Sequence, residues 1–125
     1  MPKIFFITKV AVRLDNGDIK ELPRGCYAYE FYSKNNYTII GYKNKKLQGA
    51  IDRYGNTIIP IEFSEKLEKI LFNYNIIVKV IEKRYVITER KGKHDIIDLE
   101  KMQVIYSALP DMTNVKKKLE GYEEP

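Results

Sequence analysis

A chain of 125 residues, 44% hydrophobic and 31% charged, fits one globular domain with its own core, which excludes an extended disordered chain. The single cysteine, Cys26, excludes an intramolecular disulfide and favours a reducing, cytoplasmic location, and because no apolar run approaches a membrane span, no membrane partner is expected. The formal net charge of +5 arises in residues 1–60, where ten Lys and Arg stand against five Asp and Glu, and this excess favours an acidic partner.

The first predicted element is a hairpin near the N-terminus. Residues 4–14 combine an apolar run with the alternation of Val10, Val12 and Leu14, which is typical of a strand. Asn16-Gly17 tolerates the positive φ angles of a type I′ turn, and residues 19–22 supply the returning strand before Pro23.

Short strands and turns continue through the middle of the chain. Residues 26–32 alternate and are rich in tyrosine, residues 37–42 form another apolar stretch, and residues 43–46 form a charged turn that leads to a strand beginning at Leu47. Residues 65–71 have helical spacing with Ser64 as the N-cap, but so short a segment is equally compatible with a helical turn or an irregular strand.

The second half repeats the β pattern and ends in a helix. Residues 75–81, 85–88 and 102–106 predict strands, with a polar turn at residues 90–94. Val115 and Leu119 are spaced for a short helix over residues 111–120, capped by Asp111 or Thr113 and ended by Gly121. We expect a β-repeat domain over residues 1–110 and a helical or frayed tail over residues 111–125.

Three of these segments have a common pattern, in which an apolar residue and an aspartate enter a turn and a run of Ile, Leu or Val leaves it. The aspartates are Asp15, Asp52 and Asp98, spaced by 37 and then 46 residues. The expected fold is therefore all-β or mostly β, with about three successive hairpin repeat units in one small domain and a short C-terminal helix.

Residues 49–63, Gly-Ala-Ile-Asp-Arg-Tyr-Gly-Asn-Thr-Ile-Ile-Pro-Ile-Glu-Phe, resemble one unit of the WG (or KWG) repeat, a β-rich bacterial repeat. Gly49 would let two strands approach closely, Asp52 would cap the turn and Gly55 would take a positive φ. The namesake Trp would fall at Gln48, and the third segment has Lys101 in place of Gly55. The resemblance implies a degenerate array of stacked hairpins that serves as an interaction scaffold.

Catalytic and metal-binding patterns are weak in this sequence. The only histidine, His94, lies in a polar run and is interpreted as an exposed turn residue. Asp52 and Asp98 occupy equivalent turn positions, which capping explains more simply than an acid–base pair. One Cys and one His cannot fill a zinc shell. We therefore predict no enzyme activity, no cofactor and no metal.

The candidate binding surface combines tyrosines with lysines in the segment of residues 27–46. Such a mixture suits a protein interface, where tyrosine is enriched at energetic hot spots, and it also suits nucleic acid, where bases stack on rings and phosphates pair with cations. Our first hypothesis is a protein-binding module, such as a small inhibitor or immunity protein that masks a toxin or enzyme. The alternative is a nucleic-acid-binding β-protein. The predicted partner-binding residues are Tyr32, Lys34, Tyr37, Tyr42, Lys43, Lys45 and Lys46.

Overall fold

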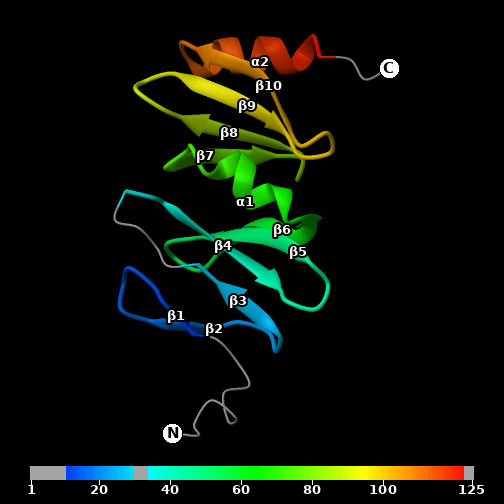
Figure 1. Ribbon diagram of the computed structural model, residues 1–125. Helices are drawn as coiled ribbons and strands as arrows, with labels where there is room; N and C mark the ends of the chain where they lie inside the picture. Colours follow the sequence, from blue (N-terminus) through cyan, green and yellow to red (C-terminus); the bar gives the residue numbers. More distant parts are fainter. Residues whose placement is uncertain (1–10, 30–33, 123–125) are drawn as a thin grey trace, which may run out of the picture.

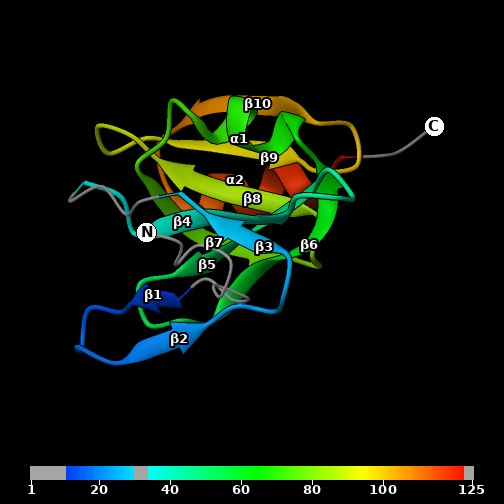
Figure 2. The ribbon, with the colours of Figure 1, turned by 60° about the horizontal axis from the view of Figure 1, so that its bottom comes forward.

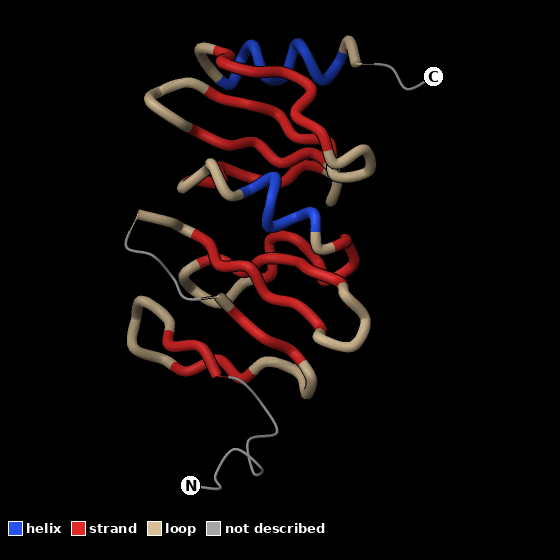
Figure 3. Tube along the Cα trace, viewed as in Figure 1, coloured by secondary structure: helices blue, strands red, loops and turns tan. Residues whose placement is uncertain are grey.

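The computed structural model describes residues 11–29 and 34–122, and in these ranges it contains ten strands and two helices (Figure 1). The mostly β fold and the short C-terminal helix are confirmed (Figure 3). Residues 4–10 of the first expected strand, and Tyr32, lie outside the described residues. The elements are β1 (Ala11–Arg13), β2 (Ile19–Glu21), β3 (Cys26–Ala28), β4 (Tyr37–Tyr42), β5 (Leu47–Asp52), β6 (Thr57–Ser64), α1 (Lys66–Leu71), β7 (Ile76–Ile81), β8 (Tyr85–Glu89), β9 (His94–Asp98), β10 (Gln103–Leu109) and α2 (Met112–Glu120).

The chain builds the same arrangement twice. Strands β3 to β6 pair in chain order as one antiparallel sheet followed by α1, and strands β7 to β10 pair in chain order as a second sheet followed by α2. The registers correspond as well, because Tyr37 faces Asp52 across β4 and β5, and Tyr85 faces Asp98 across β8 and β9. Hairpin β1–β2 lies outside these two sheets (Figure 2).

The layers stack along one direction, with α1 between the two four-stranded sheets and α2 beyond the second (Figure 1). Three apolar clusters fill the spaces between the layers. Because the central strands are covered on both faces, neighbouring residues enter different cores: Ile39 joins the core between the sheets, whereas Ile40 joins the cluster that contains Val12 and Leu22 of the first hairpin.

The structure confirms the three predicted hairpins as β1–β2, β5–β6 and β9–β10. Their turns differ from the prediction in detail. Gly17 has a φ of +92°, but Asn16 does not have a positive φ, so the first turn is not type I′. The N–H of Gly17 donates to the Leu14 carbonyl, as the N–H of Gly55 does to the Asp52 carbonyl, which makes Leu14 and not Asp15 the equivalent of Asp52.

The third turn is one residue longer than the second. The residue with a positive φ is Met102, at +50°, and not Lys101, which the sequence comparison had placed opposite Gly55. The first two turns also touch, because the N–H of Asp15 donates to the Arg53 carbonyl and the Arg53 guanidinium lies 2.7 Å from the Asp15 carboxylate. The first and second hairpins therefore pack turn against turn.

Replacing Gly55 by valine should lower the free energy of unfolding by about 1–3 kcal/mol more than Lys45→Ala does. Gly55 has a φ of +90°, which a β-branched residue does not tolerate, and an added Cβ would lie 3.0 Å from Leu14 Cδ1 of the neighbouring turn. Lys45 is exposed in a separate turn. Urea unfolding of both variants measures the difference, and equal stabilities would contradict the turn geometry.

The two helices begin differently. In α1 the N-cap residue is Glu65, whose side chain caps no backbone N–H. Ser64 Oγ accepts one hydrogen bond of 3.3 Å, from the Lys66 N–H. The prediction that Ser64 is the N-cap is therefore wrong. In α2 Asp111 caps the helix as predicted, with its carboxylate accepting from the Asn114 N–H at 2.8 Å. Neither helix is long enough to cross a membrane.

Candidate functional site

Three of the predicted binding residues, Lys43, Lys45 and Lys46, are exposed in the turn between β4 and β5. The ammonium of Lys45 lies 5.4 Å from the centre of the half-buried Tyr42 ring. The N–H of Lys43 donates to the Gly25 carbonyl, which places the turn of exposed Arg24 beside this turn. We call Arg24, Lys43, Lys45 and Lys46 the cationic end. Arg24 is the one of these four residues that the sequence did not predict as a binding residue.

The remaining predicted residues do not join that turn. Lys34 precedes the opposite end of β4, and Tyr32 lies outside the described residues. Tyr37 is only 4% exposed, and its hydroxyl lies 2.9 Å and 2.5 Å from the carbonyl oxygens of Leu71 and Tyr74. The prediction that Tyr37 presents a ring on the surface is therefore wrong, because both faces of β4 are covered and this side chain ties β4 to the end of α1.

A cleft of about 610 Å³ opens between β4 and the end of α1, and we call it the Phe72 cleft. Its apolar surface includes Ile39 and Leu71 from the core, while the side chain of Phe72 is 84% exposed and that of Tyr29 is 44% exposed. Lys34 and Glu68 also line it, so the cleft has an apolar surface with a charge of each sign.

Glu68 is fixed by a network that also fixes Tyr29. Gln48, which is fully buried, accepts from the Glu68 backbone N–H and donates to the Glu68 carboxylate, both at 3.1 Å. A hydrogen bond to Glu68, together with burial and the charge of this carboxylate, raises the pKa of Tyr29 to about 12. Tyr29 is thus a neutral donor at physiological pH, suited to packing and hydrogen bonding.

A second cleft, of about 330 Å³, lies between the β5–β6 turn and β7, and we call it the Tyr54 cleft. Tyr54 is 67% exposed and Val78 is 41% exposed, with Ile58 beside them. Asp52 lines this cleft but is committed to the turn, because its carboxylate accepts hydrogen bonds from the backbone N–H groups of Tyr54 and Asn56, both at 2.9 Å.

The two clefts are neighbours. Asn35 lines the first and Asn36 the second, and the N–H of Asn36 donates to the carbonyl of Asn75, which also lines the first. Four of the six large hydrophobic residues that are exposed in the described ranges line these clefts, namely Tyr29, Tyr54, Phe72 and Val78. We call this surface the two-cleft face.

Sequence reasoning missed most of the two-cleft face. Of its exposed residues, only Lys34 was among the predicted binding residues. One signal was present, since Phe72 follows Leu67 and Leu71 but falls off the face of the helix that they define. A second signal was Tyr54, because the turn in which it was predicted to lie does not require a large aromatic side chain.

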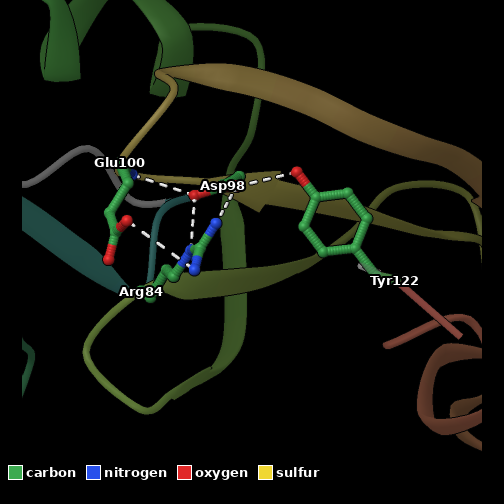
Figure 4. Close-up of polar contacts among 4 residues, drawn as sticks. All are labelled: Arg84, Asp98, Glu100 and Tyr122. Carbon is green, nitrogen blue, oxygen red and sulfur yellow. Dashed lines mark hydrogen bonds and ion pairs between the residues drawn. The ribbon is translucent and has the colours of Figure 1, made fainter. Parts of the chain in front are cut away.

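Asp98 is the centre of a separate polar cluster at the β9–β10 turn (Figure 4). Its side chain is fully buried and accepts two hydrogen bonds from the Arg84 guanidinium, at 2.9 and 2.8 Å, and one from the Tyr122 hydroxyl at 3.0 Å. Burial alone would raise the pKa of Asp98, but the hydrogen bonds from Arg84, Tyr122 and the Glu100 N–H lower it. The arrangement holds the C-terminal segment against the turn and leaves the carboxylate without access to a substrate.

His94 begins β9 and is half-buried, so its interpretation as an exposed turn residue is wrong. Its Nδ1 lies 3.0 Å from the Thr88 carbonyl oxygen, which can only accept, so the ring donates this hydrogen bond to β8. In the ranges that the structure describes, no group of three or more His, Cys, Asp or Glu side chains is placed to hold a metal ion.

Comparison with protein-family models, with curated proteins and with solved structures finds no match to this chain.

Proposed function

We propose that the protein is a non-enzymatic protein-binding module and that the two-cleft face is its binding surface. The observation that carries this proposal is the gathering of exposed Tyr29, Tyr54, Phe72 and Val78 around two adjacent clefts. Exposed apolar side chains are common singly, but a contiguous group beside a concavity is typical of an interface. Aromatic anchors of this kind dominate binding energy at protein interfaces.

The charges of the face favour an acidic protein partner. Lys34 and Lys79 are exposed at the clefts, and no ion pair joins either of them to another residue of the described ranges. The two carboxylates that line the clefts already accept hydrogen bonds within the protein. Asp52 accepts from backbone N–H groups of its own turn, and half-buried Glu68 accepts from Gln48. Cations at the rim of an apolar surface steer an acidic partner and increase its association rate.

The form of binding that we favour is masking of a toxin or an enzyme by a small inhibitor or immunity protein. Such complexes need about 800 Å² of surface from each partner, which a chain of this length can present. Stacked hairpins with both faces of the central strands buried give a preformed surface, so little ordering opposes binding. The recurrence of the hairpin also supports our proposal that the chain is a degenerate WG-type array.

Replacing Phe72 by alanine should weaken binding to the partner by about 30-fold, which corresponds to the 2 kcal/mol of a hot spot. The partner is first captured by the wild-type chain from an extract of the source cells, then purified and titrated by calorimetry. Val104→Ala is the matched control, because Val104 is exposed but lies outside both clefts. An unchanged affinity of Phe72→Ala would contradict the proposal.

The alternative function, nucleic-acid binding, is favoured by the cationic end and its contact with Tyr42. In an electrophoretic shift assay with single- and double-stranded DNA and RNA, binding of this kind must weaken steeply with salt. It must also be lost when Lys43, Lys45 and Lys46 are all changed to glutamate. Tight binding with both properties would replace protein binding as the function, whereas no shift at low salt removes this alternative.

A further inference from the structure

Strand β7 is an open edge beside the Tyr54 cleft. It is an edge strand of the second sheet, and among the strands of the described residues it pairs only with β8. It is rich in β-branched residues, and unlike the edge strand β6, which contains Pro60, it has no proline. An edge strand presents unpaired backbone groups to which an extended segment of another chain can add.

The side chain of Asn36 bonds to the first part of this edge, at Ile77, as the backbone of an added strand would. Its side-chain Oδ1 accepts from the Ile77 N–H, and its Nδ2 donates to the Ile77 carbonyl, both at 2.9 Å. Two residues that face each other in an antiparallel pair exchange the same two kinds of hydrogen bond. The backbone groups of Ile77 therefore point away from β8 and toward the open side.

The register shows where the open edge continues. Ile77 pairs with Thr88, Val78 is an extra residue in a bulge, and Val80 pairs with Val86. Bonded and non-bonded pairs alternate along an antiparallel ladder, so Val80 is the next residue whose N–H and carbonyl face outward. No hydrogen bond from outside the β7–β8 ladder reaches Val80 from another described residue.

The charges beside the edge decide whether β7 of a second copy or an acidic segment of another protein fits there better. Exposed Lys79 lies between Val78 and Val80, and Arg53 at the same cleft is paired with Asp15. If β7 of a second copy paired antiparallel with β7 through Val80, the two Lys79 side chains would lie diagonally across the strand pair on one face, where long side chains of like charge come within reach and repel. An acidic segment places a carboxylate there instead.

We propose that β7 accepts an extended acidic segment of the protein partner as a fifth strand of the second sheet. The added strand bonds to the backbone of Val80, places an apolar side chain beside Tyr54 and Ile58, and brings a carboxylate to Lys79. This inference rests on the proposed function, because it states how the partner of the two-cleft face binds.

The first test uses the full chain and a synthetic peptide of alternating valine and glutamate, with amide hydrogen exchange followed by NMR. Without peptide, the Val80 amide should exchange at least about tenfold faster than the Ile77 amide, which Asn36 protects. With peptide, Val80 exchange should slow by about tenfold or more. The same peptide N-methylated at its valines should have no effect. Unchanged Val80 exchange at millimolar peptide overturns the proposal.

The second test uses the captured partner and separates this proposal from the proposed function. Val80→Pro removes the outward N–H and should weaken partner binding by about tenfold or more, whereas Val80→Thr keeps it and should bind like the wild type. Thermal melting verifies that both variants fold, and if Val80→Pro does not, the exchange measurement decides. If Phe72→Ala loses the partner while folded Val80→Pro retains it, strand addition is overturned and the protein-binding function stands. A dimer of the free chain that Val80→Pro abolishes also overturns the proposal, in favour of pairing between copies.

Discussion

Replacing Asp98 by alanine is expected to lower the free energy of unfolding by about 3 kcal/mol, because Arg84 loses its buried, doubly hydrogen-bonded partner, and the exposed Glu100 carboxylate, 3.6 Å from the guanidinium, compensates only in part. The Arg84 side chain is only 15% exposed, and that of Asp98 is not exposed at all. The loss also frees the Tyr122 hydroxyl and the Glu100 N–H, which both donate to this carboxylate. Urea unfolding at neutral pH measures the effect.

Two controls separate the charge pair from the rest of the cluster. Tyr122→Phe removes one hydrogen bond to Asp98 and leaves the ion pair, so it should cost only about 1 kcal/mol. A double variant, Arg84→Met with Asp98→Leu, removes both charges and should be more stable than Asp98→Ala alone. If Asp98→Ala is no less stable than Tyr122→Phe, the ion pair does not contribute as the structure indicates.

The pH dependence of this effect has a defined sign. The pKa of Asp98 is lower in the folded protein than its ordinary value near 3.9, so the unfolded chain binds the proton more readily. The carboxylate therefore contributes its full stabilisation above the unfolded pKa, and this contribution is lost as the pH falls through the folded pKa. The stability difference between the wild type and Asp98→Asn should be large at pH 7 and shrink below about pH 4.

The contrast between Asp52 and Asp98 shows what the sequence contains and what it does not. Both were predicted as turn residues, and both do accept a backbone N–H two residues ahead. Local spacing determines that bond, so it could be predicted. The burial of Asp98 depends on Arg84 and Tyr122, which approach it only after β8 and α2 have packed, and no local pattern reports this.

The strands were predictable for a related reason, and the binding surface was not. Alternation and turn residues act locally, and they located β4 at residues 37–42 and the three hairpins. They did not show which tyrosines are exposed, because strands covered on both faces lose the period of two that separates inside from outside. The two-cleft face draws Tyr29, Tyr54, Phe72 and Val78 from four segments, so only the packed chain defines it.

Gly49 marks the closest approach between two backbones among the described glycines. A Cβ added there would lie 2.4 Å from the Ile59 carbonyl oxygen and 2.6 Å from two backbone atoms of Pro60, all well inside contact distance. The ladder of β5 and β6 also shifts register between Gln48 and Ala50, which is the position of Gly49. The expected role of this glycine, close approach of a neighbouring strand, is therefore confirmed.

Gly49→Ala should consequently lower the free energy of unfolding by about 3 kcal/mol, the upper end of what overpacking costs, because the clash is with backbone that cannot rotate away. The displaced β6 carries Ile59 into the core between the sheets, so the strain is transmitted to that core. Gly121→Ala is the matched control, since Gly121 has a φ of −88° and its added Cβ would meet nothing closer than 3.6 Å. Its stability should change by less than about 1 kcal/mol. Urea unfolding of the two variants makes the comparison, and equal stabilities would mean that β5 and β6 do not approach each other as closely at Gly49 as the structure shows.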